Sequence, residues 1–504
     1  MVLLNACTTL GPDYQEPPVE WLEDWNTSLY GQVGTTENQA EIDLRFWWRL
    51  FDDPVLNRLI DAAKQANPTL RIAGLRILES RAQLGIAEST LYPQVQQING
   101  AIDYVNTLQR GGDLPDTDQS FVGYQAGFNL GWELDFWGKF RRGIESADAA
   151  FFASIANQQD VQVLLSAQVT DLYFAYRTIE LRISIARENA AIQERSYEIT
   201  QRLYKSGQQS ELDLQQARTQ YLATLSTIPE LQISLTQTRN ALCALLGRPP
   251  GDLRELNEQT TELPGVDPVV IHALPARLLM RRPDVRAAAW QAAAQSAQIG
   301  VAEADFYPAI SLFGSIGWRG DTLSSSSGIG TLALGPSLTW NIFDYGRIGN
   351  NVRVQDARLQ QLIEQYQNTV LQAAREIDDA AITVVKTAEQ LQVLQQTVDA
   401  ANRALALANT LYQEGYADFQ RVLDAQRAAF SQAERELINR GNQISAVIAL
   451  YKSLGGGWFD MPIRELVPEK TREQMKERTE WGGLLEKPLP DGELKPASST
   501  ETSQ

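Results

Sequence analysis

Four segments of the chain alternate between apolar and polar residues. In the clearest, from Val122 to Phe136, every even position is apolar or alanine, and the odd positions are glycine or polar. A period of two predicts β-strands with one apolar face, at about 94–108, 121–136, 308–320 and 332–344. Segments near the ~10 residues needed to cross a bilayer, with aromatic ends, are typical of a membrane β-barrel wall. A soluble sandwich with one buried face is the alternative reading of the same pattern.

Four strands are too few to close a barrel. Open strand edges are not tolerated in hydrocarbon, because each unpaired backbone group there costs several kcal/mol. Several copies of the chain are therefore expected to pool their strands in a symmetric homo-oligomer. Two, three or four copies would give barrels of 8, 12 or 16 strands, and the alternation alone does not choose among them.

Two helical segments are too long for an ordinary globular domain. Lys139 to Leu203 and Arg347 to Leu411 contain no proline, and each would span roughly 100 Å as one helix at ~1.5 Å per residue. Their apolar positions recur at coiled-coil spacing. Each segment is followed by a glycine-containing turn and a shorter helix, from Leu212 to Leu246 or from Phe419 to Leu454. Such hairpins, arranged around the axis of a barrel, would make a tube.

The chain also contains an internal repeat. Asn67-Pro68 recurs 215 positions later as Arg282-Pro283, and Trp132 recurs 208 positions later as Trp340. We therefore divide the chain into a first repeat with its helical hairpin at 139–247, a second repeat with its hairpin at 346–454, and flanking segments. The full boundaries are 1–7 (signal remnant), 8–53 (N-terminal segment), 54–247 (first repeat), 248–282 (connector), 283–454 (second repeat) and 455–504 (C-terminal segment with a disordered tail).

Composition gives little support to catalysis. The formal charge of -18 makes nucleic acid an unfavourable partner. The sequence contains no run of 18 apolar residues, so it predicts no membrane-spanning helix. The one histidine, His272, lies near a proline-rich connector, and Cys243 occupies a packing position at a helix end. Because no catalytic, cofactor-binding or phosphate-binding motif is present, we expect neither an enzyme nor a cofactor or metal site.

Cys7 differs from these residues. It follows Leu4-Asn5-Ala6, which resembles the end of a bacterial lipoprotein signal peptide with the cysteine as the lipidated first residue. Asn5 is unusual in such a motif, and the preceding residues are too few for a full signal. Lipidation of Cys7 and anchoring in outer-membrane lipid are expected, with a fortuitous cysteine as the alternative.

Three longer stretches carry a family resemblance. They are Trp47 to Leu56 (WWRLFDDPVL), Leu134 to Arg142 (LDFWGKFRR) and Leu274 to Val285 (LPARLLMRRPDV). The chain resembles the outer-membrane efflux factors, the TolC-like and OprM-like lipoproteins that serve as exit ducts of resistance-nodulation-division pumps. The resemblance implies an α+β membrane protein, with a trimeric 12-stranded transmembrane β-barrel continuous with a periplasmic α-helical barrel and a mixed equatorial belt. It also implies a periplasmic adaptor and an inner-membrane transporter as partners.

The resemblance further implies a gate at the helical tips in the periplasm. Asp424 matches the acidic constriction position of the family and Arg427 its basic neighbour, whereas Gln420 replaces an apolar constriction residue of close relatives. The other gate candidates are Arg421, Asp418 and Tyr412, with Asp213 of the first hairpin as a weaker one. The alternative for all these charges is ordinary solvated decoration of helix ends.

Several functions fit these features. The leading hypothesis is the outer-membrane exit duct of a tripartite pump, a passive gated channel for drugs or other small solutes. The same duct serving a metal-ion pump or type I protein secretion is a second possibility. A non-conducting structural protein of the bacterial envelope is a third.

Overall fold

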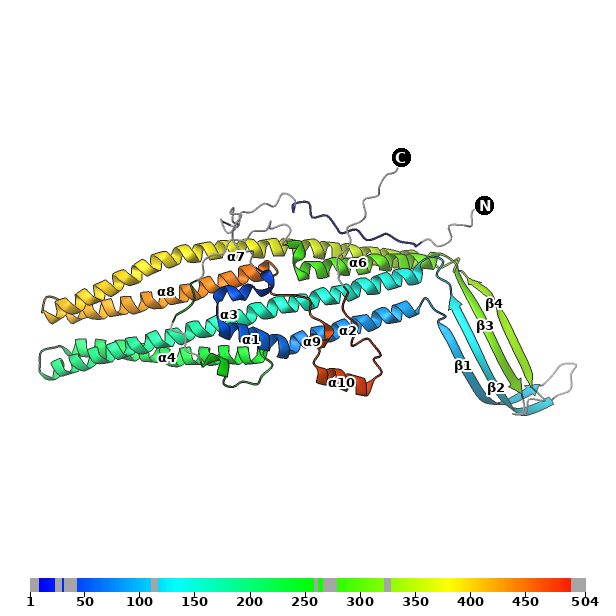
Figure 1. Ribbon diagram of the computed structural model, residues 1–504, viewed down its shortest axis with the longest axis horizontal. Helices are drawn as coiled ribbons and strands as arrows, with labels where there is room; N and C mark the ends of the chain where they lie inside the picture. The colour runs from blue at the N-terminus through cyan, green and yellow to red at the C-terminus, as the bar shows by residue number, and fades with distance from the viewer. Residues whose placement is uncertain are drawn as a thin grey trace.

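The computed structural model describes residues 9–22, 30, 43–109, 117–257, 262–265, 279–320 and 328–490. It is elongated, with a four-stranded sheet at one end and the tips of two long helical hairpins at the other (Figure 1). The strands are antiparallel in the order β1-β2-β3-β4. Their bounds are β1 Val95–Gln109, β2 Thr117–Glu133, β3 Ala309–Gly320 and β4 Ile329–Thr339.

The two faces of the sheet differ as the alternation predicts. Cross-strand pairing places one row of apolar side chains side by side on the even-numbered face: Ile98, Phe128, Ile316 and Leu332. The chain leaves this row uncovered, with Ile98 85% and Leu332 80% exposed. Polar side chains pair on the other face, where Asn129 Nδ2 donates to Asn99 Oδ1 at 3.1 Å. An apolar face of this size that its own chain does not cover is typical of a surface for lipid or another subunit.

The last strand ends earlier than the alternation predicts. We expected strand structure to residue 344, but β4 ends at Thr339, which pairs with the first residue of β3, Ala309. Asp344 instead accepts hydrogen bonds from the backbone N–H groups of Gly346 (3.1 Å) and Ile348 (2.6 Å). Strand pairing stops here because the partner strand has ended, and the aspartate serves the first turn of the next helix.

The described residues include six long helices. The two proline-free segments are the continuous helices α3 and α7, each two residues longer than predicted. Gly207 (φ 75°) and Gly415 (φ 80°) adopt the left-handed conformation that turns the chain into the returning helices. The bounds are α2 Pro68–Ser89, α3 Lys139–Lys205, α4 Glu211–Leu245, α6 Pro283–Glu303, α7 Arg347–Gln413 and α8 Phe419–Ser453, with the short η4 Ala304–Phe306 after α6.

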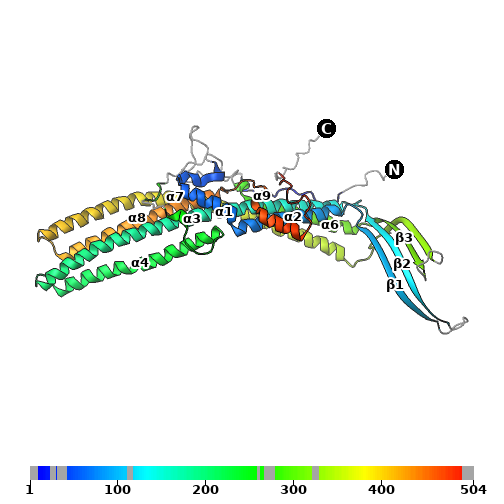
Figure 2. The same cartoon turned by 60° about the horizontal axis from the view of Figure 1, so that its bottom comes forward.

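These helices form one curved layer. Near the strands, α3 packs between α2 and α6, and α6 also packs on α7; towards the tips, α3 packs on α4 and α8, and α8 on α7. Figure 2 shows the two hairpins side by side, with α4 and α7 at the outer edges of the layer. Among the described residues, no helix has the length and apolar character to cross a bilayer.

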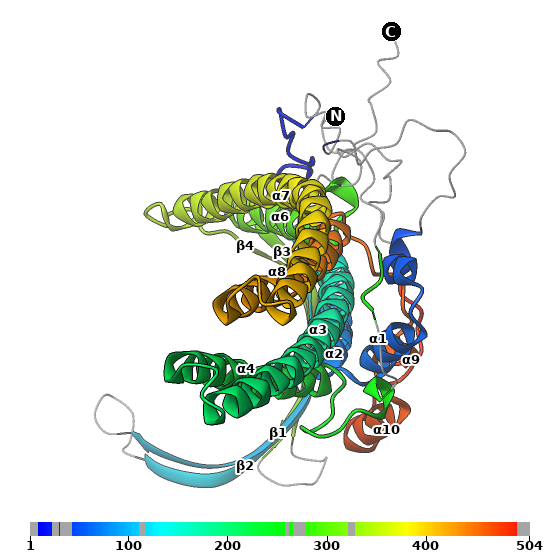
Figure 3. The ribbon, with the colours of Figure 1, turned by 90° about the vertical axis from the view of Figure 1, so that its left-hand side faces the viewer.

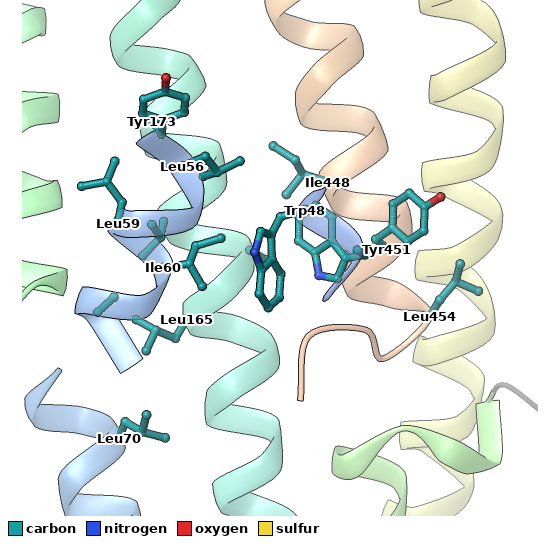
Figure 4. Close-up of a cluster of buried hydrophobic side chains, with 14 of the residues drawn as sticks. Trp48, Leu56, Leu59, Ile60, Leu70, Leu165, Tyr173, Ile448, Tyr451 and Leu454 are labelled. Carbon is teal, nitrogen blue, oxygen red and sulfur yellow. The ribbon is translucent and has the colours of Figure 1, made fainter. Parts of the chain in front are cut away.

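Short elements cover the convex side of this layer near its middle (Figure 3). Their core contains Trp47 and Phe51; Trp47 stacks on Tyr451 with centroids 5.5 Å apart, and Phe51 packs on Phe174 at 4.6 Å. Figure 4 shows Trp48 and neighbouring apolar side chains filling the space between α1 (Pro54–Ala66), α3 and α8. We call these elements the belt: η2 Leu44–Phe51, α1 Pro54–Ala66, η3 Arg254–Leu256, α9 Ile463–Leu466 and α10 Glu469–Arg478.

The first described residues, 9–18, form an extended N-terminal strap along the helices. Arg142 of α3, whose side chain is 3% exposed, donates to the carbonyl oxygens of Leu10 (2.8 Å) and Gly11 (3.0 Å). Gly11 (φ +83°) lies so close to Gly300 of α6 that a Cβ on Gly11 would be 2.5 Å from the Cα of Gly300. The strap is therefore held at one position by a buried charge and a glycine pair.

Candidate functional site at the helical tips

The second hairpin turns between α7 and α8, at the end of the molecule farthest from the strands (Figure 1). Asp418 is the N-cap of α8 and accepts a hydrogen bond from the backbone N–H of Arg421 at 3.2 Å. The Arg421 guanidinium lies 3.9 Å from the same carboxylate, and both side chains are 72% exposed. Asp418 therefore has a local task in starting the helix, as cap residues do.

Asp424 and Arg427 form an ion pair one turn further along α8. The Arg427 Nη1 donates to Asp424 Oδ1 at 3.3 Å, and Gln420 Nε2 donates to the same oxygen at 3.1 Å. Their side chains are more than half exposed, at 59% for Arg427 and 56% for Asp424. Exposed pairs of this kind contribute about 0 to 1 kcal/mol to folding, so their main effect is to orient one another.

Arg427 also links the two hairpins. Its Nε and Nη2 both donate to Gln220 Oε1 of α4, each at 3.1 Å. A second link lies nearer the turn, where Gln209 Nε2 donates to the Tyr412 hydroxyl at 3.1 Å. The Tyr412 ring packs on Phe419 with centroids 5.4 Å apart. Three of the predicted gate residues, Asp424, Arg427 and Gln420, thus contact one another. Arg427 and Tyr412 contact the first hairpin.

Asp213 has a different environment. It forms a capping box with Ser210 at the start of α4: its carboxylate accepts from the Ser210 hydroxyl at 2.6 Å, and its own N–H donates to Ser210 Oγ at 3.1 Å. In the part of the chain that the structure describes, the hydrogen bonds of Asp213 go to Ser210 and not to the Asp424 group. The helix start accounts for this carboxylate.

A shallow trough of about 720 Å³ lies in the helical layer. It crosses α2, α3 and α6 and reaches Leu362 of α7. Apart from alanine, its lining is mostly polar: Arg76, Glu79, Ser80, Gln83, Asn157, Asp160, Gln291, Gln295 and Gln298. A polar lining of this extent suits contact with water.

Asp160 is the residue of this trough whose pKa is shifted. Burial raises the pKa of its carboxyl from 3.8 to about 6; the nearby Asp284 carboxylate acts in the same direction, whereas Arg282 and Lys452 oppose it. A carboxyl whose pKa is raised in the folded state stabilises the fold below pH 3.8 and loses that contribution as the pH rises through about 6. The ionised carboxylate is therefore unfavourable at neutral pH.

Asp160→Asn is accordingly expected to stabilise the protein by about 1 to 3 kcal/mol at pH 7 and to have little effect at pH 4. The amide keeps the shape of the carboxyl but carries no charge to desolvate. Thermal unfolding of the variant and the wild type at several pH values between 4 and 7 measures the difference. A variant that is less stable at pH 7 would contradict the assignment.

Two residues singled out from the sequence, Cys7 and His272, lie outside the described residues. Cys243 is 1% exposed and packs in the belt core, as predicted for a structural cysteine. No cluster of three metal-ligating side chains occurs among the residues that the structure describes. The sequence did not predict Gln220, the partner of Arg427. The residue 208 positions after Gln220 is Ala428, so the internal repeat does not single out this glutamine.

Comparison with known proteins gives the family. The protein-family model described as outer membrane efflux protein matches residues 59–248 and 274–456, well over half of the chain. The chain belongs to the outer membrane efflux protein family. Its helical layer, strands and tips lie within these matched segments or directly between them.

Curated members of the outer membrane efflux protein family match this chain over almost their whole length. The probable outer membrane lipoprotein SilC of Salmonella typhimurium is 31% identical over 462 residues, covering 91% of this chain and 97% of SilC. The cation efflux system protein CusC of Escherichia coli is 31% identical over 461 residues, covering 90% and 96%. The solvent efflux pump outer membrane protein SrpC of Pseudomonas putida is 31% identical over 471 residues, covering 91% and 97%.

A solved structure agrees with this assignment. The outer-membrane channel OprN superposes with a TM-score of 0.81 at 31% identity, covering 89% of this chain and 99% of OprN. The predicted fold class is confirmed: this efflux protein has the α+β fold of the trimeric outer-membrane channels, with a β-barrel and a helical tunnel. It is an outer-membrane efflux channel protein of tripartite pumps.

Proposed function

We propose that this protein is the passive, gated exit duct of a tripartite pump and carries drugs or other small solutes from the periplasm to the cell exterior. The proposal is carried by the continuity of the structure from one end to the other. An uncovered apolar sheet at one end is joined by helices of 67 residues to tips that contain paired charges. The functional unit is a homotrimer that works with a periplasmic adaptor and an inner-membrane resistance-nodulation-division transporter. The duct performs no chemistry and is not an enzyme.

The lining of the trough supports a duct of low selectivity. It mixes the charges of Arg76, Glu79 and Asp160 with neutral amides, so it offers neither a strong single-sign field nor an apolar slot. Selection of the cargo then falls to the transporter. The second candidate is a metal-ion pump, because the name of CusC assigns that relative to cation efflux, whereas SrpC is named for solvent efflux.

Conductance and complementation test the proposal. The purified trimer is expected to pass ions across a planar bilayer, and co-expression with its cognate transporter and adaptor should restore drug resistance to a strain that lacks its own duct. Restored silver or copper resistance without drug resistance would favour the metal-ion pump, and export of a protein substrate would favour type I secretion. A correctly assembled protein that conducts no ions would favour the structural role.

We also propose that Cys7 carries a lipid that anchors the protein beside its barrel. SilC, which is named as a probable lipoprotein, supports this proposal, as does the motif that precedes the cysteine. Several acyl chains at ~0.8 kcal/mol per buried methylene would make the anchor durable. Mass spectrometry of the mature N-terminus from the native host should find acylated Cys7, and an unmodified thiol would refute the proposal.

A further inference from the structure

Each repeat stacks two helices end to end. In the first repeat, α4 ends where α2 begins, and Asn67 joins them: its Nδ2 donates to the carbonyl oxygen of Leu245 at 2.9 Å. Its Oδ1 accepts from the backbone N–H of Leu70 at 3.0 Å and so caps α2. One neutral side chain therefore serves both helix ends.

The second repeat makes the same joint with charges. Arg282 stands at the position of Asn67, and its Nη1 donates to the carbonyl oxygen of Ser453, the counterpart of Leu245, at 2.8 Å. Its Nη2 also donates to Asp284 at 2.8 Å and to Glu376 of α7 at 2.9 Å. Arg282 thereby bonds three helices, α6, α7 and α8, where Asn67 bonds two.

Arg282 lies among carboxylates whose negative charge its guanidinium partly balances. Its side chain is 9% exposed and packs on the turn after α8, where a Cβ on Gly455 would be 3.1 Å from Arg282 Cγ. The carboxylates of Asp160, Asp284 and Glu376 face it from α3, α6 and α7, and Lys452 of α8 is the second cation of the group. Removing the guanidinium would leave these three carboxylates with Lys452 as the remaining cation of this partly buried group.

The joint is distant from the tip but mechanically connected to it. Asp424 lies 29 residues from Ser453 on the uninterrupted helix α8, or about 45 Å at ~1.5 Å per residue. A tilt of about 5° at the joint would move that end of the helix by about 4 Å. This displacement exceeds the length of the Arg427 to Gln220 hydrogen bonds that link the two hairpins.

We propose that Arg282 is a positioning residue for the gate: its ionic joint between α8 and α6 sets the tilt of the second hairpin and thereby the distance of Asp424 and Arg427 from the first. The neutral joint at Asn67 gives the first hairpin no comparable dependence on charge. This inference rests on the proposed gated duct. It assigns control of that gate to a site at the other end of α8.

Arg282→Asn, which installs the residue that the other repeat uses, tests the proposal in the full-length trimer. In planar bilayers at about 0.1 M KCl, where exposed ion pairs are only moderately screened, the wild type should be closed most of the time. The Arg282→Asn trimer should be open on the order of tenfold more often at the same salt concentration. Arg282→Lys, which keeps the charge and a donor, should restore most of the wild-type behaviour.

Two further variants separate gating from folding. Glu376→Gln removes one carboxylate partner without emptying the site and should shift the opening part of the way. Arg281→Asn changes the exposed neighbouring arginine and should leave the frequency of opening unchanged. Trimers of Arg282→Asn and Glu376→Gln that both open as often as the wild type would overturn the role of Arg282 alone. Assembled trimers that conduct in no variant would overturn the gated duct itself.

Discussion

Ile316→Arg is expected to cost on the order of 2 to 4 kcal/mol per subunit and to prevent most of the protein from assembling in the membrane. Ile316 is 57% exposed in the middle of the apolar row that also contains Phe128 and Leu332. If that row faces hydrocarbon, a guanidinium there must be desolvated or must distort the lipid around it. The amount of trimer recovered from the outer membrane, and its resistance to unfolding by urea, measure the effect.

Ser315→Arg is the matched control. Ser315 precedes Ile316 on β3 and points to the opposite, polar face, in the row of Asn129. An arginine there would project into the water-filled interior of the barrel, so near-normal assembly is expected. Equal loss of trimer in the two variants would contradict the assignment of the faces, because a one-residue shift in a strand exchanges them.

Asp424→Ala combined with Arg427→Ala is expected to open the tip. The double variant removes both the ion pair and the two hydrogen bonds from Arg427 to Gln220. A loss of about 1 kcal/mol of closed-state stabilisation per subunit would raise the ratio of open to closed tips about fivefold. Single-channel conductance in planar bilayers should rise, and cells should become sensitive to a large antibiotic such as vancomycin.

A second ion pair on α7 provides the control. Lys386 and Glu389 are also three residues apart and similarly exposed, at 61% and 59%, but they lie nearer the middle of the helix. Replacing both with alanine should leave conductance and antibiotic entry unchanged. If the tip variant assembles normally and behaves like this control, then Asp424 and Arg427 are surface charges and the closure lies elsewhere.

Local sequence patterns predicted most of the architecture. Alternation placed the apolar face of β2 because a pleated strand turns successive side chains to opposite faces, and that rule needs no partner. The absence of proline predicted α3 and α7 to within two residues at their ends. The same alternation overextended β4, because the end of a strand depends on where its neighbour β3 begins.

Contacts between distant segments were not predictable in this way. Gly11 lies on Gly300, and Arg142 donates to the strap, through a meeting of residues far apart in the chain. The repeat drew attention to Arg282-Pro283, but the role of Arg282 appears only when the end of α8 is placed beside it. At the tip, the charges of Asp424 and Arg427 were visible in the sequence, whereas Gln220, the partner of Arg427 on α4, was not.

The N-terminal strap also determines the level, along the long axis of the molecule, at which a lipid anchor would lie. Thr9 lies against Gly138, and the N–H of Leu10 donates to the carbonyl oxygen of Trp137 at 3.2 Å, where strand β2 has given way to helix α3. Two residues of chain reach at most about 7 Å. A lipid on Cys7 would therefore enter the bilayer at the rim of the barrel and at the same level in every subunit. Insertions before Thr9 would lengthen the segment between the lipid and the strap. Insertions between Gly11 and Asp13 would instead break the hydrogen bonds from Arg142 to these residues.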